Sequence, residues 1–176
     1  MKRSHASDNL LVAAISPSPH GFGYVVFEGP QKLVDWGVRD IRQDKNRQSL
    51  EKVRDLVGWY SPDVLVLENC TVPASRRSAR IKRLTRAVLR LAQRQKLTTR
   101  SYARAEIKAA FAEIGAKTRY EIAQAIAEQV PDLGLWLPPP RKIWQSEDPR
   151  MSIFDAASLA SAFFHEGVAP SKRAKN

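Results

Sequence analysis

The chain has 176 residues, of which 43% are hydrophobic and 8% aromatic, and its formal net charge is +11. This length suits one domain with a full core, and the composition excludes a disordered chain. No apolar run approaches the roughly 20 residues of a membrane helix, and the N-terminus lacks the apolar segment of a signal peptide, so we expect a cytoplasmic protein with no membrane partner. The single cysteine, Cys70, excludes an internal disulfide and a cysteine-based metal site.

The predicted domain spans residues 10–166, between a flexible N-terminal arm (1–9) and a basic C-terminal tail (167–176). The net charge is concentrated inside this domain. Residues 69–105 contain eleven Lys or Arg and no Asp or Glu, whereas the remaining 18 basic and 18 acidic residues cancel. A positive field this concentrated favours a polyanionic partner over a purely solubilising role.

The first part of the chain predicts a small sheet and a helix. We expect three strands joined by short turns, over residues 10–15, 21–27 and 32–41. The Ser-Pro-Ser-Pro sequence at 16–19 is predicted to be the first turn. Residues 45–60 have the three- and four-residue apolar spacing of a helix. Residues 63–68 (Asp-Val-Leu-Val-Leu-Glu) then predict a strand covered on both faces.

The basic segment predicts a second helix with two distinct faces. Its apolar positions share one stripe at 3.6 residues per turn: Ile81, Leu84, Val88, Leu91 and Ala92. Its arginines share another, which we call the arginine ridge: Arg76, Arg80, Arg83, Arg90 and Arg94. Solvated surfaces normally mix both signs of charge, so an acid-free ridge favours contact with nucleic-acid phosphates over solubility alone.

The rest of the chain predicts one more strand and three helices, over residues 96–102, 103–114, 118–130 and 151–165. Thr118 and Glu121 have the spacing of a capping box. Residues 137–144 are proline-rich and predict an extended crossing. Pro149, preceded by acidic residues, is expected at the first position of the last helix.

Two acids stand at positions that favour chemistry. Glu68 ends the buried strand, at the edge where open α/β sheets bind ligands, although an acid there can also simply cap a turn. Asp155 has Met151 four residues before it and Leu159 four after, so it should face the sheet. Carboxylates on separate elements can together hold Mg²⁺. Asp148 lies on nearly the same helix face, where it acts either as a further ligand or only as the N-cap.

The order of these elements resembles that of the RuvC-like Holliday junction resolvases of the ribonuclease H-like superfamily. The matching stretches are residues 11–24, 62–68 and 154–160, and with the element order they cover roughly 9–166. The resemblance implies an α/β fold whose five-stranded mixed sheet, a three-strand antiparallel meander plus two parallel strands, is flanked by helices.

The resemblance also implies a function. It implies an endonuclease that uses Mg²⁺ or Mn²⁺, acts on branched or structured DNA in recombination and repair, and forms a homodimer. Glu68 and Asp155 match the family's strand-four glutamate and terminal-helix aspartate, so they are its implied catalytic metal ligands.

The chain departs from this family at two acidic positions. The first-strand aspartate is replaced by Ser16, and the acid one turn before the helix aspartate is replaced by Ser152. A neutral serine hydroxyl is a poor Mg²⁺ ligand. Asp148 or Glu147 could substitute, or water could fill the Ser16 position. The competing hypothesis is a nucleic-acid-binding protein that keeps the fold without efficient cleavage.

A third fold, that of the actin-like ATPases, shares the first-strand pattern. It needs two such domains and glycine-rich phosphate loops, whereas this chain is short and has only 8 glycines. We therefore rank it last.

Further residues are candidates for nucleic-acid contact. Arg76 and Arg77 follow Glu68 closely and could bind phosphates beside the site. Lys142, in the proline-rich crossing, could reach a scissile phosphate. Three aromatic residues either stack on unpaired bases or, as aromatics near proline turns more commonly do, pack against the protein: Tyr120, Trp136 and Trp144.

Overall fold

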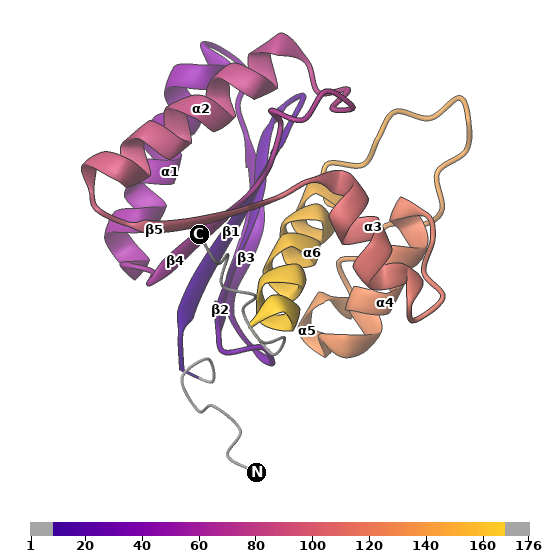
Figure 1. Cartoon of the computed structure of the whole chain (residues 1–176). Helices are drawn as coiled ribbons and strands as arrows, with labels where there is room; N and C mark the ends of the chain where they lie inside the picture. Colours follow the sequence, from indigo (N-terminus) through magenta and orange to yellow (C-terminus); the bar gives the residue numbers. More distant parts are fainter. Residues whose placement is uncertain (1–8, 168–176) are drawn as a thin grey trace.

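The computed structural model describes residues 9–167 and is built on one five-stranded sheet in the order β3-β2-β1-β4-β5 (Figure 1). The strands are β1 (Leu11–Ser18), β2 (Gly21–Glu28), β3 (Lys32–Asp40), β4 (Val64–Glu68) and β5 (Thr98–Tyr102). The first three form an antiparallel meander, and β4 and β5 are parallel to β1. The predicted mixed sheet is confirmed. Most of the predicted arm and tail lies outside the described residues.

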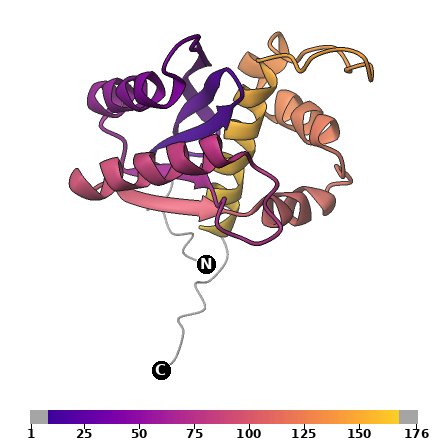
Figure 2. The same ribbon diagram turned by 90° about the horizontal axis from the view of Figure 1, so that it is seen from above.

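Helices cover both faces of the sheet (Figure 2). One face carries α1 (Lys45–Tyr60) and α2 (Ala79–Arg94), and the other carries α6 (Met151–Glu166). Three shorter helices lie on the α6 side: α3 (Arg104–Ala112), α4 (Arg119–Gln129) and α5 (Pro131–Gly134). Among residues 9–167 there is no helix with the length and apolar character needed to cross a bilayer.

The alternation of side chains along β1 and β4 divides the core in two. Every second residue packs toward α6, and this set contains Val12, Ala14, Val64 and Val66. The residues between them pack toward α1 and α2, and this set contains Ala13, Ile15, Leu65 and Leu67. Because both faces are covered, β4 is a continuous apolar run. Ser16 and Glu68 continue this alternation, so their side chains point to the α6 side.

β1 is longer than the sequence predicts. It passes through Ser16 and Pro17 to Ser18, so the prediction of a turn over 16–19 is wrong. β2 pairs with β1 along this whole extension, whereas β4 stops pairing with it at Ile15. Pro17 is tolerated because one side of the strand is free of a neighbour there. The extension carries Ser16 to the end of β4.

The ends of two helices also differ from prediction. α2 begins at Ala79, where the Ser78 hydroxyl caps it, so Arg76 lies in the preceding loop and not on the helical ridge. α6 begins at Met151, and Asp148 does not cap it. The Asp148 carboxylate instead accepts hydrogen bonds from the backbone N–H and guanidinium of Arg150. The predicted apolar stripe of α2 is buried, and the capping box that opens α4 is confirmed.

Candidate carboxylate centre and nucleic-acid interface

Ser16, Glu68 and Asp155 line one cavity of about 30 Å³ at the carboxyl ends of β1 and β4. Ser16 is 1% exposed and Glu68 is 9% exposed, and the Asp155 side chain is 15% exposed. Two strands and α6 therefore bring together the three positions that the sequence singles out, from elements far apart in the chain.

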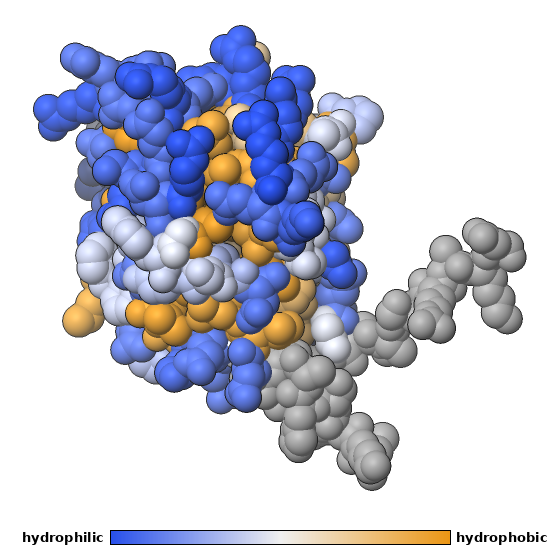
Figure 3. Space-filling model, turned by 90° about the vertical axis from the view of Figure 1, so that its left-hand side faces the viewer, coloured by the Kyte–Doolittle hydropathy of each residue, from blue (hydrophilic) through white to orange (hydrophobic). Residues whose placement is uncertain are grey.

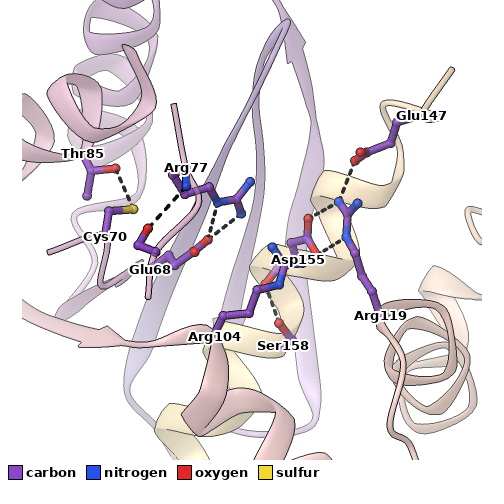
Figure 4. Close-up of polar contacts among 10 residues, drawn as sticks. Glu68, Cys70, Arg77, Thr85, Arg104, Arg119, Glu147, Asp155 and Ser158 are labelled. Carbon is purple, nitrogen blue, oxygen red and sulfur yellow. Dashed lines mark hydrogen bonds and ion pairs between the residues drawn. The ribbon is translucent and has the colours of Figure 1, made fainter. Parts of the chain in front are cut away.

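Glu68 is held by an arginine from the loop that follows its own strand. Both Nε and Nη2 of Arg77 donate hydrogen bonds to Glu68 Oε2, the Nε bond at 2.9 Å (Figure 4). Burial alone would lower the pKa of Arg77, but the hydrogen bond and charge of Glu68 outweigh it and raise the pKa. Arg77, which the sequence suggests as a phosphate contact, lies in this pair.

Asp155 is held in the same way from the other side. Arg119, the first residue of α4, donates from Nε to Asp155 Oδ1 at 2.9 Å and from Nη2 to Oδ2. The same Nη2 donates to Glu147 Oε1 at 2.6 Å, and Arg104 Nη2 lies 3.7 Å from Asp155 Oδ1 (Figure 4). Burial would lower the pKa of Arg119, but these carboxylates raise it, and Arg119 in turn lowers the pKa of Glu147.

Sequence reasoning missed Arg104 and Arg119. Arg119 follows the capping residue Thr118, so its place at the start of a helix is readable from sequence. Arg119 and Asp155 are 36 residues apart in the sequence, and only the packing of α4 on α6 brings them together. No local spacing signals such a pair.

Three solved structures share this arrangement of elements. The Thermus thermophilus RuvC structure superposes with a TM-score of 0.61 and 20% identity, over 89% of this chain and 95% of that chain. Thermus thermophilus RuvC in complex with Holliday junction substrate gives 0.64 and 16%, over 89% and 94%. The yeast mitochondrial Holliday junction resolvase Ydc2 gives 0.65 and 14%, over 91% and 80%.

The chain has the ribonuclease H-like fold. The five-stranded mixed sheet with flanking helices expected from the sequence is that of these resolvases. No protein-family model and no curated protein sequence matches the chain.

A divalent metal does not fit the centre that this ribonuclease H-like fold presents. Its cavity is lined by two acids and four cations, Arg77, Arg104, Lys108 and Arg119. Mg²⁺ prefers several negatively charged or neutral oxygen ligands, but Glu68 and Asp155 already accept guanidinium hydrogen bonds. Residues 9–167 contain no group of three His, Cys, Asp or Glu side chains placed to hold a metal ion. The buried Ser16 hydroxyl, which has no hydrogen-bond partner among residues 9–167, lines a cavity with room for about one water.

Neither substitute acid reaches the Ser16 cavity. Glu147 pairs with Arg119, and Asp148 pairs with Arg150, whose guanidinium lowers the pKa of the Asp148 carboxyl. Both acids line a larger neighbouring cavity of about 890 Å³, which is also lined by the proline-rich crossing. The serine in β1 therefore has no acidic replacement among the described residues.

The arginine ridge is largely exposed on the outer side of α2. Arg83, Arg90 and Arg94 are exposed, and Arg76 is exposed in the loop before the helix. Arg80 differs, since its guanidinium donates to Ser18 O at 2.6 Å and Asn46 Oδ1 at 3.1 Å, which ties α2 to β1 and α1. Burial lowers its pKa. Figure 3 shows a largely hydrophilic surface on this side of the molecule, with apolar surface between the polar groups.

Two of the three candidate aromatic residues make contacts with other parts of the protein, although Trp136 stays 40% exposed. Trp136 meets Trp36 of β3 edge to face, with ring centroids 6.3 Å apart. The Tyr120 hydroxyl donates to Pro138 O at 2.9 Å. Trp144 is 79% exposed, and the Lys142 ammonium lies 5.5 Å from its ring centroid. Trp144 and Lys142 remain accessible to a partner.

Proposed function

We propose that this protein binds branched or structured DNA through its basic surface and does not cleave it by metal-dependent hydrolysis. One observation carries the second half of the proposal: each carboxylate at the expected metal position is hydrogen-bonded by an arginine, Glu68 by Arg77 and Asp155 by Arg119. The first half is supported by the acid-free basic segment and by the fold, which the RuvC structure with Holliday junction substrate shares.

The exposed arginines of α2 suit a phosphate backbone. At a rise of about 1.5 Å per residue, Arg83 and Arg94 are separated by about 16 Å along the helix axis. This length spans several phosphates of a DNA strand. The planar guanidinium group of arginine can also donate two hydrogen bonds to the oxygens of one phosphate. Binding of this kind is sequence-independent and weakens as salt is added.

A metal-dependent endodeoxyribonuclease is the second candidate. It is favoured by the convergence of Ser16, Glu68 and Asp155 on one cavity at the strand ends. For this function, Arg77 and Arg119 would have to leave their carboxylates before any cation could bind. Breaking two partly buried ion pairs is costly, which is why DNA binding without cleavage is the function that we favour.

The deciding experiment is binding and cleavage of a synthetic four-way junction, with Mg²⁺, with Mn²⁺ and with EDTA. We expect tight binding under all three conditions and an intact junction after incubation. A linear duplex of the same length is the substrate control and should bind more weakly. Cleavage that requires metal and disappears in Glu68→Gln would establish the nuclease in place of our proposal.

A further inference from the structure

A third pocket lies across the end of β4 from the carboxylate centre. It has a volume of about 300 Å³ and lies between α2 and the end of β5. Ser101 of β5 pairs with Leu67, whose side chain packs toward α2, so the pocket is on the opposite side of the sheet from Asp155. We call it the α2 pocket. Its polar lining comprises Asn69, Thr71, Lys82, Thr85, Arg86 and Ser101.

The α2 pocket presents hydrogen-bond donors with few internal acceptors. Arg86 donates from Nε to Lys82 O at 3.3 Å, and its two terminal amino groups make no hydrogen bond within residues 9–167. Among the described residues, Lys82 Nζ has one acceptor, Ser75 O, at 3.3 Å. Asn69 Oδ1 accepts from the Thr71 backbone N–H and hydroxyl, and the amide NH₂ of Asn69, which makes no hydrogen bond within the described part of the chain, can donate to a ligand.

The charge of the pocket is also one-sided. Glu68 is the only acid in its lining, and the carboxylate of that residue accepts the hydrogen bonds of Arg77. At the floor, the Cys70 thiol lies 3.8 Å from the Thr85 hydroxyl. Burial, followed by the charge of Glu68, raises the pKa of Cys70, so this floor carries no thiolate near pH 7. Two cations and several neutral donors therefore face an open volume.

We propose that the α2 pocket binds a backbone phosphate of DNA, held by Arg86 and Lys82 with Asn69 and Ser101 as neutral donors. A tetrahedral oxyanion needs several convergent donors and gains most from charge-assisted hydrogen bonds, which this lining supplies. The inference rests on the proposed function, since the phosphate belongs to bound DNA. A phosphate bound in the α2 pocket would place the DNA strand over the carboxyl ends of β4 and β5, beside Glu68 and its partner Arg77.

The first test uses inorganic phosphate as the probe. Titration of the ¹⁵N-labelled protein should shift the amide signals of residues 69–71, 82–86 and 101, and Arg86→Ala should abolish these shifts. Arg100→Ala is the matched control, because it removes the same charge one residue from Ser101 and outside the pocket lining. Shifts that persist unchanged in Arg86→Ala would place the phosphate elsewhere and overturn the proposal.

The second test uses a four-way DNA junction and separates a DNA phosphate from a free one. Arg86→Ala should weaken binding at least about threefold and reduce the magnitude of the negative slope of log affinity against log salt by about 1, while Arg100→Ala should have smaller effects on both. Ser101→Asp, which adds a carboxylate to the pocket, is the second variant, and thermal melting checks the fold of each.

The outcomes distinguish this inference from the proposed function. Equal junction affinity of Arg86→Ala and Arg100→Ala, with tight binding by the unmodified protein, removes the pocket from the interface but leaves DNA binding intact. A response to inorganic phosphate without any effect on DNA affinity assigns the pocket to free phosphate and overturns the DNA assignment. Failure of the unmodified protein to bind any junction overturns both proposals.

Discussion

Arg119 occupies both carboxylate oxygens of Asp155 and, through the same Nη2 atom, reaches Glu147. One guanidinium thus joins the start of α4 to the second turn of α6 and to the chain segment before α6 (Figure 4). The sequence resemblance implies that Asp155 is a metal ligand, but here its carboxylate accepts the guanidinium of Arg119 in place of a metal cation. The centre is held together by ion pairs that leave little negative charge unpaired.

Removing Arg119 should destabilise the protein. Arg119→Ala leaves Asp155 and Glu147 without their main partner, and we expect a loss of about 1–3 kcal/mol in the free energy of unfolding, below the cost for a fully buried pair because both side chains are partly exposed. Urea denaturation measures it. The control is Arg150→Ala, which breaks the more exposed pair with Asp148 and should cost under about 1 kcal/mol. Equal losses in the two variants would show that Arg119 is only a surface residue.

A metal site should appear when the net positive charge of the cavity is neutralised. Ser16→Asp with Arg77→Gln adds one carboxylate and removes one guanidinium, so Glu68 is freed beside a new acid. We expect Mn²⁺ to raise the melting temperature of this variant, because a ligand that binds only the folded state stabilises it. Ser16→Asn with Arg77→Gln is the matched control and should not respond. The idea fails if the unmodified protein responds to Mn²⁺ as strongly as the variant.

Features that depend on local spacing could be predicted from the sequence. The apolar stripe of α2 follows from 3.6-residue periodicity, and the capping box of α4 follows from Thr118 and Glu121, three residues apart. The run that ends at Glu68 marked β4 as a buried strand. In each case the residues that decide the structure lie within one turn or one strand of each other.

The partners of the acids could not be predicted, because they depend on tertiary packing. Nothing near Asp155 in the sequence indicates Arg119. The position of Arg77 soon after Glu68 predicts a phosphate contact beside the site, whereas the fold of the loop pairs Arg77 with Glu68 itself. β1 continued past Pro17 because β2 pairs with it there, which outweighed the turn preference of the Ser-Pro repeat. Arg80 shared the angular position of the ridge, but the end of β1 lies close enough to accept its hydrogen bond.

Charge on the outer side of α2 should control DNA affinity and its salt dependence. Arg90→Glu removes an exposed cation from the ridge, so we expect weaker junction binding and a negative slope of log affinity against log salt whose magnitude is smaller by about 1. Fluorescence anisotropy over a range of salt concentrations measures both. Lys32→Glu, the same charge reversal on the edge strand β3, is the control. Identical slopes for the two variants would exclude α2 from the interface.

A close approach of α6 to β2 should make Gly23 intolerant of a side chain. A Cβ atom at Gly23 would lie 2.3 Å from the backbone carbonyl carbon of Ser152, so Gly23→Ala must push the helix away from the sheet. We expect a loss of several kcal/mol in the free energy of unfolding, since overpacking a core commonly costs about 1–3 kcal/mol and here the obstacle is backbone. Gly58→Ala in α1, with open space around the added methyl, should instead stabilise by up to about 1 kcal/mol.

The Tyr24 hydroxyl should make stability fall at high pH. It donates to Asp35 Oδ2 at 2.9 Å and accepts from Arg39 Nη2 at 3.1 Å, and burial followed by the Asp35 hydrogen bond raises its pKa from 10.0 to about 12. A folded-state pKa above the unfolded value means that the neutral phenol stabilises the fold below about pH 10, and that this contribution is lost as the pH rises toward about 12. Tyr60 also donates to Asp35, so its pKa is raised too and it adds to the decline. Urea denaturation between about pH 9 and pH 12 should show that the free energy of unfolding falls less steeply with pH for Tyr24→Phe than for the unmodified protein. Parallel curves for the two proteins would mean that Tyr24 does not contribute to the decline.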